Sequence, residues 1–154
     1  MKYILSILMI VGLTLSSYSK SKEVGENIDV THYEIHLNEI NVADRIIDAT
    51  TIITLKTLTS IDGIELELKS LDVTSVTSDD AIINNFSQNG DVLSVTFGNP
   101  VTANTTISLT VNYGGTTFNE NWGGIHWSND YVYNLGVGFD SQPHNLGKTW
   151  FPCV

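Results

Sequence analysis

The hydrophobic residues of this chain alternate with polar residues over short stretches from position 31 onwards. In segment 31–38, Tyr33, Ile35 and Leu37 share one side of an extended backbone, and the polar residues between them share the other. Successive side chains of a β-strand point to opposite faces, so this period of two predicts a strand with one buried face. The same alternation recurs in segments 49–55, 64–68, 93–97 and 107–113.

Weaker strand patterns are present at 73–77, 81–86 and 131–137, and no helical period follows residue 20. Abundant Thr and Val favour strands. The chain is therefore predicted to be all-β, an antiparallel β-sandwich or a saddle-shaped pair of sheets in which each sheet hides one face against the other. Turn signals are found at Asp62-Gly63, Asn89-Gly90-Asp91, Gly98-Asn99-Pro100 and Gly114-Gly115.

The alternation also predicts which residues face the core, since the apolar member of each pair should point inward. The predicted core residues are Tyr33, Ile35, Leu37, Ile53, Leu55, Leu66, Leu68, Val95, Phe97, Leu109 and Val111.

The N-terminus has the pattern of a secretory signal peptide. Lys2 precedes an apolar run at 3–15, and Ser17-Tyr18-Ser19 supplies small residues where a signal peptidase reads. Residues 1–19 are therefore predicted to form a signal-peptide helix, 20–27 a flexible lead-in, and 28–154 one β domain. An uncleaved anchor is the alternative, although the run is short for a bilayer span.

Charge and cysteine content limit the classes of binding partner and the cellular compartment that the chain fits. Seven basic residues against 17 acidic ones give a formal net charge of −10, so nucleic acid, which needs a basic face, is a poor partner. The single cysteine, Cys153, cannot form an internal disulfide. A signal peptide without disulfides suggests a secreted or periplasmic bacterial protein.

Few residues offer catalytic or metal-binding chemistry. His32 and His36 have the spacing of a helical zinc pair, but on a strand they lie about 13 Å apart, too far to share one ion. Asp79-Asp80 is typical of a solvated turn rather than of an acid–base pair. The sequence therefore predicts no metal site and no catalytic residue in this chain.

Aromatic residues are concentrated near the C-terminus. The five concerned are Trp122, Trp127, Tyr131, Tyr133 and Trp150. Packing within the domain or against another domain is the favoured interpretation, and a carbohydrate-stacking platform is the alternative.

Three stretches resemble the aminopeptidase N family of zinc metallopeptidases. Segment 29–37 (DVTHYEIHL) is similar to the family's opening strand, 66–76 (LELKSLDVTSV) to an internal strand pair, and 147–153 (GKTWFPC) to the exit of the first domain. The resemblance covers about residues 28–153. It implies the N-terminal non-catalytic domain of such an enzyme, ending before the catalytic domain.

That family's N-terminal domain is a saddle-like β unit that packs over the zinc domain and walls the peptide cleft. Family members use a Gln or Glu about ten residues before the cysteine to hold the substrate's amino group. Counting back from Cys153 reaches Pro143, so the neighbouring Gln142 becomes the tentative substrate-binding residue. Lys148 matches a basic residue of the family, with an ordinary surface charge as the alternative.

The resemblance assigns zinc, its ligands and the general base to the missing catalytic domain, so this chain alone should need no cofactor and be inactive. Its expected partners are a peptide substrate and the catalytic domain, with no stable membrane span after signal cleavage. A free-standing secreted module that binds glycan or peptide is the alternative. With the continuation lost, residues after about 140 are expected to be mobile and exposed, and Cys153 to be reactive.

Overall fold

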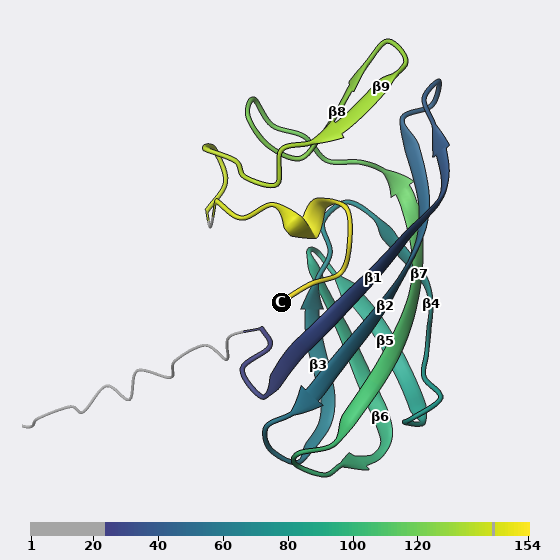
Figure 1. Ribbon diagram of the computed structural model, residues 1–154, viewed down its shortest axis with the longest axis vertical. Coiled ribbons are helices and arrows are strands. Elements are labelled where there is room, and N and C mark those ends of the chain that lie inside the picture. Colours follow the sequence, from purple (N-terminus) through teal and green to yellow (C-terminus); the bar gives the residue numbers. More distant parts are fainter. Residues whose placement is uncertain (1–23, 143) are drawn as a thin grey trace, which may run out of the picture.

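The protein is a sandwich of two antiparallel sheets, seen in a computed structural model that describes residues 24–142 and 144–154 (Figure 1). The predicted all-β fold is confirmed. The first sheet has the order β1-β2-β7-β4. Its strands are β1 (Ile28–Asn41), β2 (Ile46–Thr57), β7 (Thr106–Thr116) and β4 (Asp72–Thr77).

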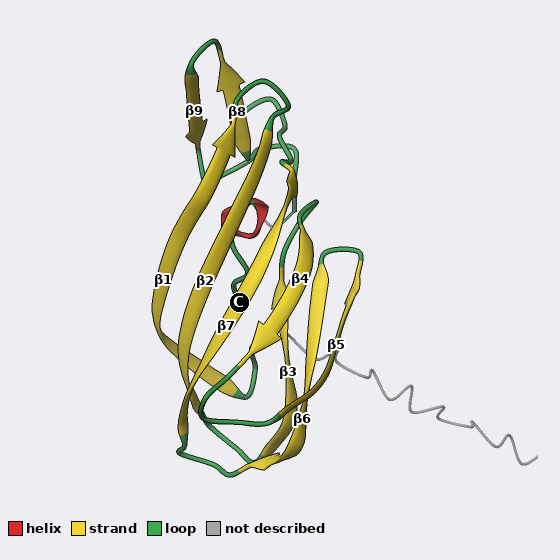
Figure 2. Cartoon of the chain, turned by 90° about the vertical axis from the view of Figure 1, so that its right-hand side faces the viewer, coloured by secondary structure: helices red, strands yellow, loops and turns green. Residues whose placement is uncertain are grey.

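The second sheet is smaller and has the order β3-β6-β5. Its strands are β3 (Ile61–Glu67), β6 (Val92–Val101) and β5 (Ile83–Asn89). A separate hairpin of β8 (Ile125–Ser128) and β9 (Tyr131–Asn134) extends beyond one end of the sandwich (Figure 2). The predicted signal peptide at 1–19 and its helix lie outside the described residues.

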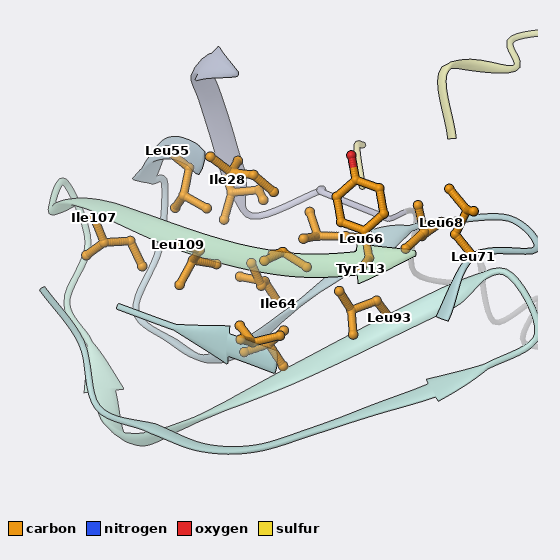
Figure 3. Packing of buried hydrophobic residues seen from close by; sticks show 14 of the residues in the cluster. Ile28, Leu55, Ile64, Leu66, Leu68, Leu71, Leu93, Ile107, Leu109 and Tyr113 are labelled. Atoms are coloured by element: carbon orange, nitrogen blue, oxygen red, sulfur yellow. The ribbon is translucent and has the colours of Figure 1, made fainter. Parts of the chain in front are cut away.

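The core lies between the two sheets, where the inward residues of each strand meet (Figure 3). Eight predicted core residues are buried, which confirms the period-two assignment: Ile53, Leu55, Leu66, Leu68, Val95, Phe97, Leu109 and Val111. Tyr33 is half-buried and packs against this core. Ile35 is half-buried as well.

Leu37 is the exception, because 43% of its surface is exposed. It lies on the edge strand β1, which pairs only with β2 among the described strands, and its part of the strand extends past the three-stranded sheet (Figure 2). The prediction of a fully buried Leu37 is wrong because no strand of the second sheet covers that end. The residue instead lines a groove beneath the β8–β9 hairpin.

Three of the four turn signals lie inside strands. Only Asn89-Gly90-Asp91 forms a turn, between β5 and β6. Gly63 lies in β3 next to a register shift, and a Cβ there would collide with the carbonyl oxygen of Val95. A Cβ on Gly114 in β7 would likewise come too close to the carbonyl oxygen of Ile47, at 2.7 Å. These glycines permit close backbone approach within the sheets, a role that the sequence does not distinguish from a turn.

Helical structure is minimal in the described ranges. One 3₁₀ turn, η1 (Gly147–Thr149), precedes the C-terminus. None of the helical structure in residues 24–142 and 144–154 is long and apolar enough to cross a bilayer.

We expect Leu109→Ala to lower the free energy of unfolding by about 2–5 kcal/mol, because it leaves a cavity between the sheets. Leu109 is 0% exposed, whereas Leu58 is 52% exposed and serves as a matched control. Leu58→Ala should change the free energy by no more than about 0.5 kcal/mol. Urea unfolding measures both, and equal effects of the two substitutions would contradict the assigned core.

Candidate functional site

The C-terminal segment, defined here as residues 146–154, lies across the end of the sandwich where the two sheets diverge (Figure 1). It pairs with the end of β3: Cys153 N–H donates to Glu67 O (3.0 Å) and Glu67 N–H donates to Cys153 O (2.7 Å). Lys69 N–H donates to Lys148 O (2.7 Å). The segment therefore continues the pairing of the smaller sheet.

Two tyrosines attach the same segment to the larger sheet. Tyr113 on β7 donates its hydroxyl to Trp150 O (2.8 Å) and lies 2.9 Å from Thr51 Oγ1. Because the single phenolic proton goes to the carbonyl, the Thr51 hydroxyl donates to Tyr113. The ring of Tyr33 contacts Phe151 edge-on with centroids 5.2 Å apart. The C-terminal segment is thus held by both sheets.

Cys153 is buried, so the prediction of an exposed and reactive thiol is wrong. Burial, with a smaller contribution from the nearby Glu67 carboxylate, raises its pKa from 9.0 to about 11. Pro152 is buried, and Trp150 and Phe151 are half-buried against the core. The expected exposure is found at Gln142, His144 and Asn145 but not at residues 149–153. There the edge of β3 and the inner face of the larger sheet supply the covering that the prediction assigned to another domain.

Lys148 is a buried ion-pair partner rather than an ordinary surface charge. Its Nζ lies 2.7 Å from Glu67 Oε1 and 3.7 Å from Asp91 Oδ2, and its side chain is 11% exposed. Burial alone would lower its pKa, but the hydrogen bond and charge of Glu67, aided by Asp91, raise the pKa above its ordinary value. The ammonium therefore stays charged and links the C-terminal segment to β3.

Two loops lie beside the hairpin, and the second of them contains the predicted substrate-binding residue. We call residues 117–124 the first distal loop and 135–145 the second. Isolated pairings, Asn119 with Gly124 and Val137 with Asn145, narrow each loop at its base. Glu120 of the first loop accepts hydrogen bonds from the second, at the backbone of Asp140 (3.1 Å) and Ser141 (3.3 Å).

Gln142 is exposed on the second distal loop, and its Nε2 lies 3.2 Å from Nε2 of His144. His144 Nδ1 lies 2.7 Å from Gly138 O, and a carbonyl can only accept, so Nδ1 carries the proton. In the neutral ring Nε2 is then an acceptor for the Gln142 amide N–H. Among the described residues no donor reaches the Gln142 amide oxygen.

The aromatic residues divide into two groups. Trp127 and Trp150 pack against the core, and Trp127 Nε1 donates to Thr117 Oγ1 (2.9 Å), which confirms packing for these two. Trp122, Tyr131 and Tyr133 are exposed, at 64%, 74% and 48%. Trp122 lies edge-on to Phe139 with ring centroids 6.4 Å apart. Exposed aromatic side chains are therefore concentrated at this end of the domain.

An apolar groove of about 440 Å³ lies between the ends of β1 and β2 and the β8–β9 hairpin. Leu37, Ile40 and Ile47 form one wall, and Val132 and Leu135 form the other. Trp150 of the C-terminal segment also lines it. The groove has the composition of a docking surface, with few polar groups to orient a small molecule.

Residues 24–142 and 144–154 contain no group of three or more His, Cys, Asp or Glu side chains able to hold a metal ion. His32 and His36 lie exposed on β1, where His36 Nε2 contacts Glu34 Oε1 at 2.9 Å. The residues that the structure describes therefore do not fit a zinc site.

No protein-family model and no curated protein matches the chain. Solved structures do. An M1 zinc metallopeptidase from Deinococcus radiodurans matches with a TM-score of 0.67 and 21% identity. A mutant of it bound to a Tyr-Ser-Ala substrate matches with a TM-score of 0.69, and so does a two-domain M1 zinc metallopeptidase mutant bound to L-tryptophan. Each match covers 84% of this chain.

The chain has the fold of one part of an M1 zinc metallopeptidase. It spans 30% of the length of the matched chains. At 21% identity this similarity is evidence about the fold alone. The resemblance found in the sequence is therefore confirmed for the fold.

The sequence did not reveal several residues that shape this M1-like domain. Glu120 stands between two asparagines in a loop, and its partners lie about twenty residues away, so no local pattern marks it. The sequence also contained no indication of the apolar groove, because Leu37 has the pattern of an ordinary inward-facing strand residue. The sequence around Cys153 also did not indicate that its segment pairs with Glu67 and accepts a hydrogen bond from Tyr113.

We expect Cys153 to react slowly with a thiol reagent in the native chain at pH 8. Its raised pKa leaves roughly a hundredfold fewer thiolates than an ordinary thiol has, and the surrounding residues block access. Labelling should accelerate as the pH approaches 11, and it should be rapid at pH 8 once urea unfolds the chain. A native rate at pH 8 equal to the unfolded rate would contradict the packed C-terminal segment.

Proposed function

We propose that this chain is the non-catalytic β domain of an M1-type zinc aminopeptidase, in which it walls the peptide cleft and packs on a catalytic domain. The M1-like fold, which corresponds to 30% of the matched chains, is the observation that carries the proposal. The FPC motif at 151–153 and the strand pattern at 29–37 support it. Zinc and the general base would belong to the catalytic domain.

The geometry of the distal loops supports a role in peptide recognition. The N–H of the Gln142 amide is engaged by His144, and its oxygen is free to accept from the ammonium of a peptide N-terminus. A hydrogen bond to a charged group is worth about 1.5–3 kcal/mol. Gln142 is therefore the residue that we propose for holding the substrate's amino group.

The apolar groove supports the packing role. A hollow lined mainly by apolar side chains is typical of an interface or a ligand groove in soluble proteins. The groove lies at the same end of the domain as Gln142, since both border the β8–β9 hairpin and the loop that follows it. A catalytic domain seated there would bring its cleft next to the distal loops.

We also propose that the protein is exported to the periplasm or secreted. The apolar run at 3–15 after Lys2 and the small residues at 17–19 support this assignment.

A free-standing glycan- or peptide-binding module is the second candidate. The exposed Trp122, Tyr131 and Phe139 favour it, because aromatic faces stack on sugar rings. Against it, Trp122 and Phe139 meet edge-on at 77°, so they do not form one flat platform. A stop codon directly after Val154, together with oligosaccharide binding that Trp122→Ala abolishes, would decide for this second function.

We expect the purified chain to release no residue from aminoacyl substrates, with or without added zinc, because its described residues do not fit a zinc site. Zinc-dependent release by this chain would contradict the proposal. The genomic sequence beyond Val154 provides the complementary measurement. An acidic residue followed some 150 or more residues later by an H-E-x-x-H segment is the expected result.

In the protein encoded by that longer reading frame, Gln142→Ala should raise KM for aminoacyl substrates by about 10- to 100-fold, which corresponds to the loss of one charged hydrogen bond. The zinc content should be unchanged. Asn99→Ala is a matched control, since Asn99 is an exposed amide on β6. Equal steady-state constants for the two variants would remove Gln142 from substrate binding.

A further inference from the structure

A single carboxylate joins the two distal loops. Glu120 Oε1 accepts hydrogen bonds from the backbone N–H of Asp140 (3.1 Å) and of Ser141 (3.3 Å), and Oε2 accepts one from the Ser141 hydroxyl. Gly138 leaves room for this approach, because a Cβ there would collide with Glu120 Oε1. Asn121 adds a fourth link by donating to Asp140 Oδ2 (3.2 Å).

The first distal loop is itself attached to the sandwich, so Glu120 has a fixed base. Trp127 donates to Thr117, and Ile125 N–H donates to Phe118 O (2.8 Å). Lys69 places its ammonium 4.0 Å from the centre of the Phe118 ring. These contacts connect the loop to β8 and to the residue that follows β3 by two positions.

We infer that Glu120 is the positioning residue for Gln142. The two peptide N–H groups that it binds belong to the two residues immediately before Gln142, so the carboxylate fixes the backbone from which that side chain extends. The two carboxylate oxygens accept all three bonds at once, whereas the single carbonyl oxygen of a glutamine could accept at most two of them. The assignment rests on the proposed function for Gln142's role towards substrate, but the positioning itself concerns this chain alone.

The charge of Glu120 is stabilised by the same contacts. The hydrogen bond from the Ser141 hydroxyl, with the two backbone N–H groups and the more distant Lys69 ammonium, holds its pKa below the ordinary value. The carboxylate is thus ionised at neutral pH and makes charge-assisted bonds.

Nuclear magnetic resonance on this chain tests the inference without any catalytic activity. Glu120→Ala should speed amide hydrogen exchange at Asp140 and Ser141 about tenfold or more, the loss expected for a charge-assisted bond. It should also bring the two side-chain amide protons of Gln142 to the shifts of a free glutamine. Glu120→Gln keeps one acceptor oxygen and should restore part of the protection.

Asp130→Ala is the matched control, since Asp130 is an exposed acid in the β8–β9 turn. It should leave exchange and the Gln142 amide signals unchanged, and core amides such as that of Leu109 should stay protected in every variant. The inference is overturned if amide exchange at Asp140 and Ser141 is unchanged in Glu120→Ala. It is also overturned if exchange in Glu120→Ala is faster but the Gln142 side-chain signals do not move, or if Asp130→Ala changes exchange and signals as much as Glu120→Ala does. KM of Gln142→Ala in the longer protein tests the proposed function separately.

Discussion

The smaller sheet is too short to cover the whole inner face of the larger sheet (Figure 2). The C-terminal segment supplies part of the missing cover. Its key contact is the buried hydroxyl of Tyr113, which is 1% exposed and donates to Trp150 O while accepting from Thr51. Without the segment the hydroxyl would keep Thr51 as its partner, so Trp150 O contributes one of its two hydrogen bonds, which is worth about 0.5–1.5 kcal/mol.

The position of the segment has consequences for charge and for the groove. Lys148 is brought to Glu67 and Asp91, and with Lys69 it accounts for two of the few basic residues in the described chain. Carboxylates elsewhere on the surface are left largely without cationic partners, as expected for a net charge of −10. Trp150 also lines the apolar groove, so the same segment packs against the core and contributes to the surface where we propose the catalytic domain to dock.

Beyond the groove, the molecule changes from strand packing to loops held by polar contacts. The distal loops contain little apolar core of their own, and hydrogen bonds through Glu120 and His144 fix their course. Loops on a rigid sandwich are a common location for recognition residues. The exposed Trp122 and Tyr131 and the free amide oxygen of Gln142 all lie in this region, which sets it apart from the polar outer faces of the sheets.

Sequence alone determined the sandwich, because a strand with one buried face must alternate, and residues such as Ile53, Leu66 and Leu109 carry that alternation in local order. It also directed attention to Gln142 through a resemblance in the FPC region. Tertiary structure alone decided whether an inward position was covered: Leu37 has the right orientation but lies beyond the second sheet. It also decided the burial of Cys153 and the contacts of Glu120. The partner of Cys153, Glu67, is 86 residues away and the partners of Glu120 are about twenty residues away, and no local pattern encodes contacts at such separations.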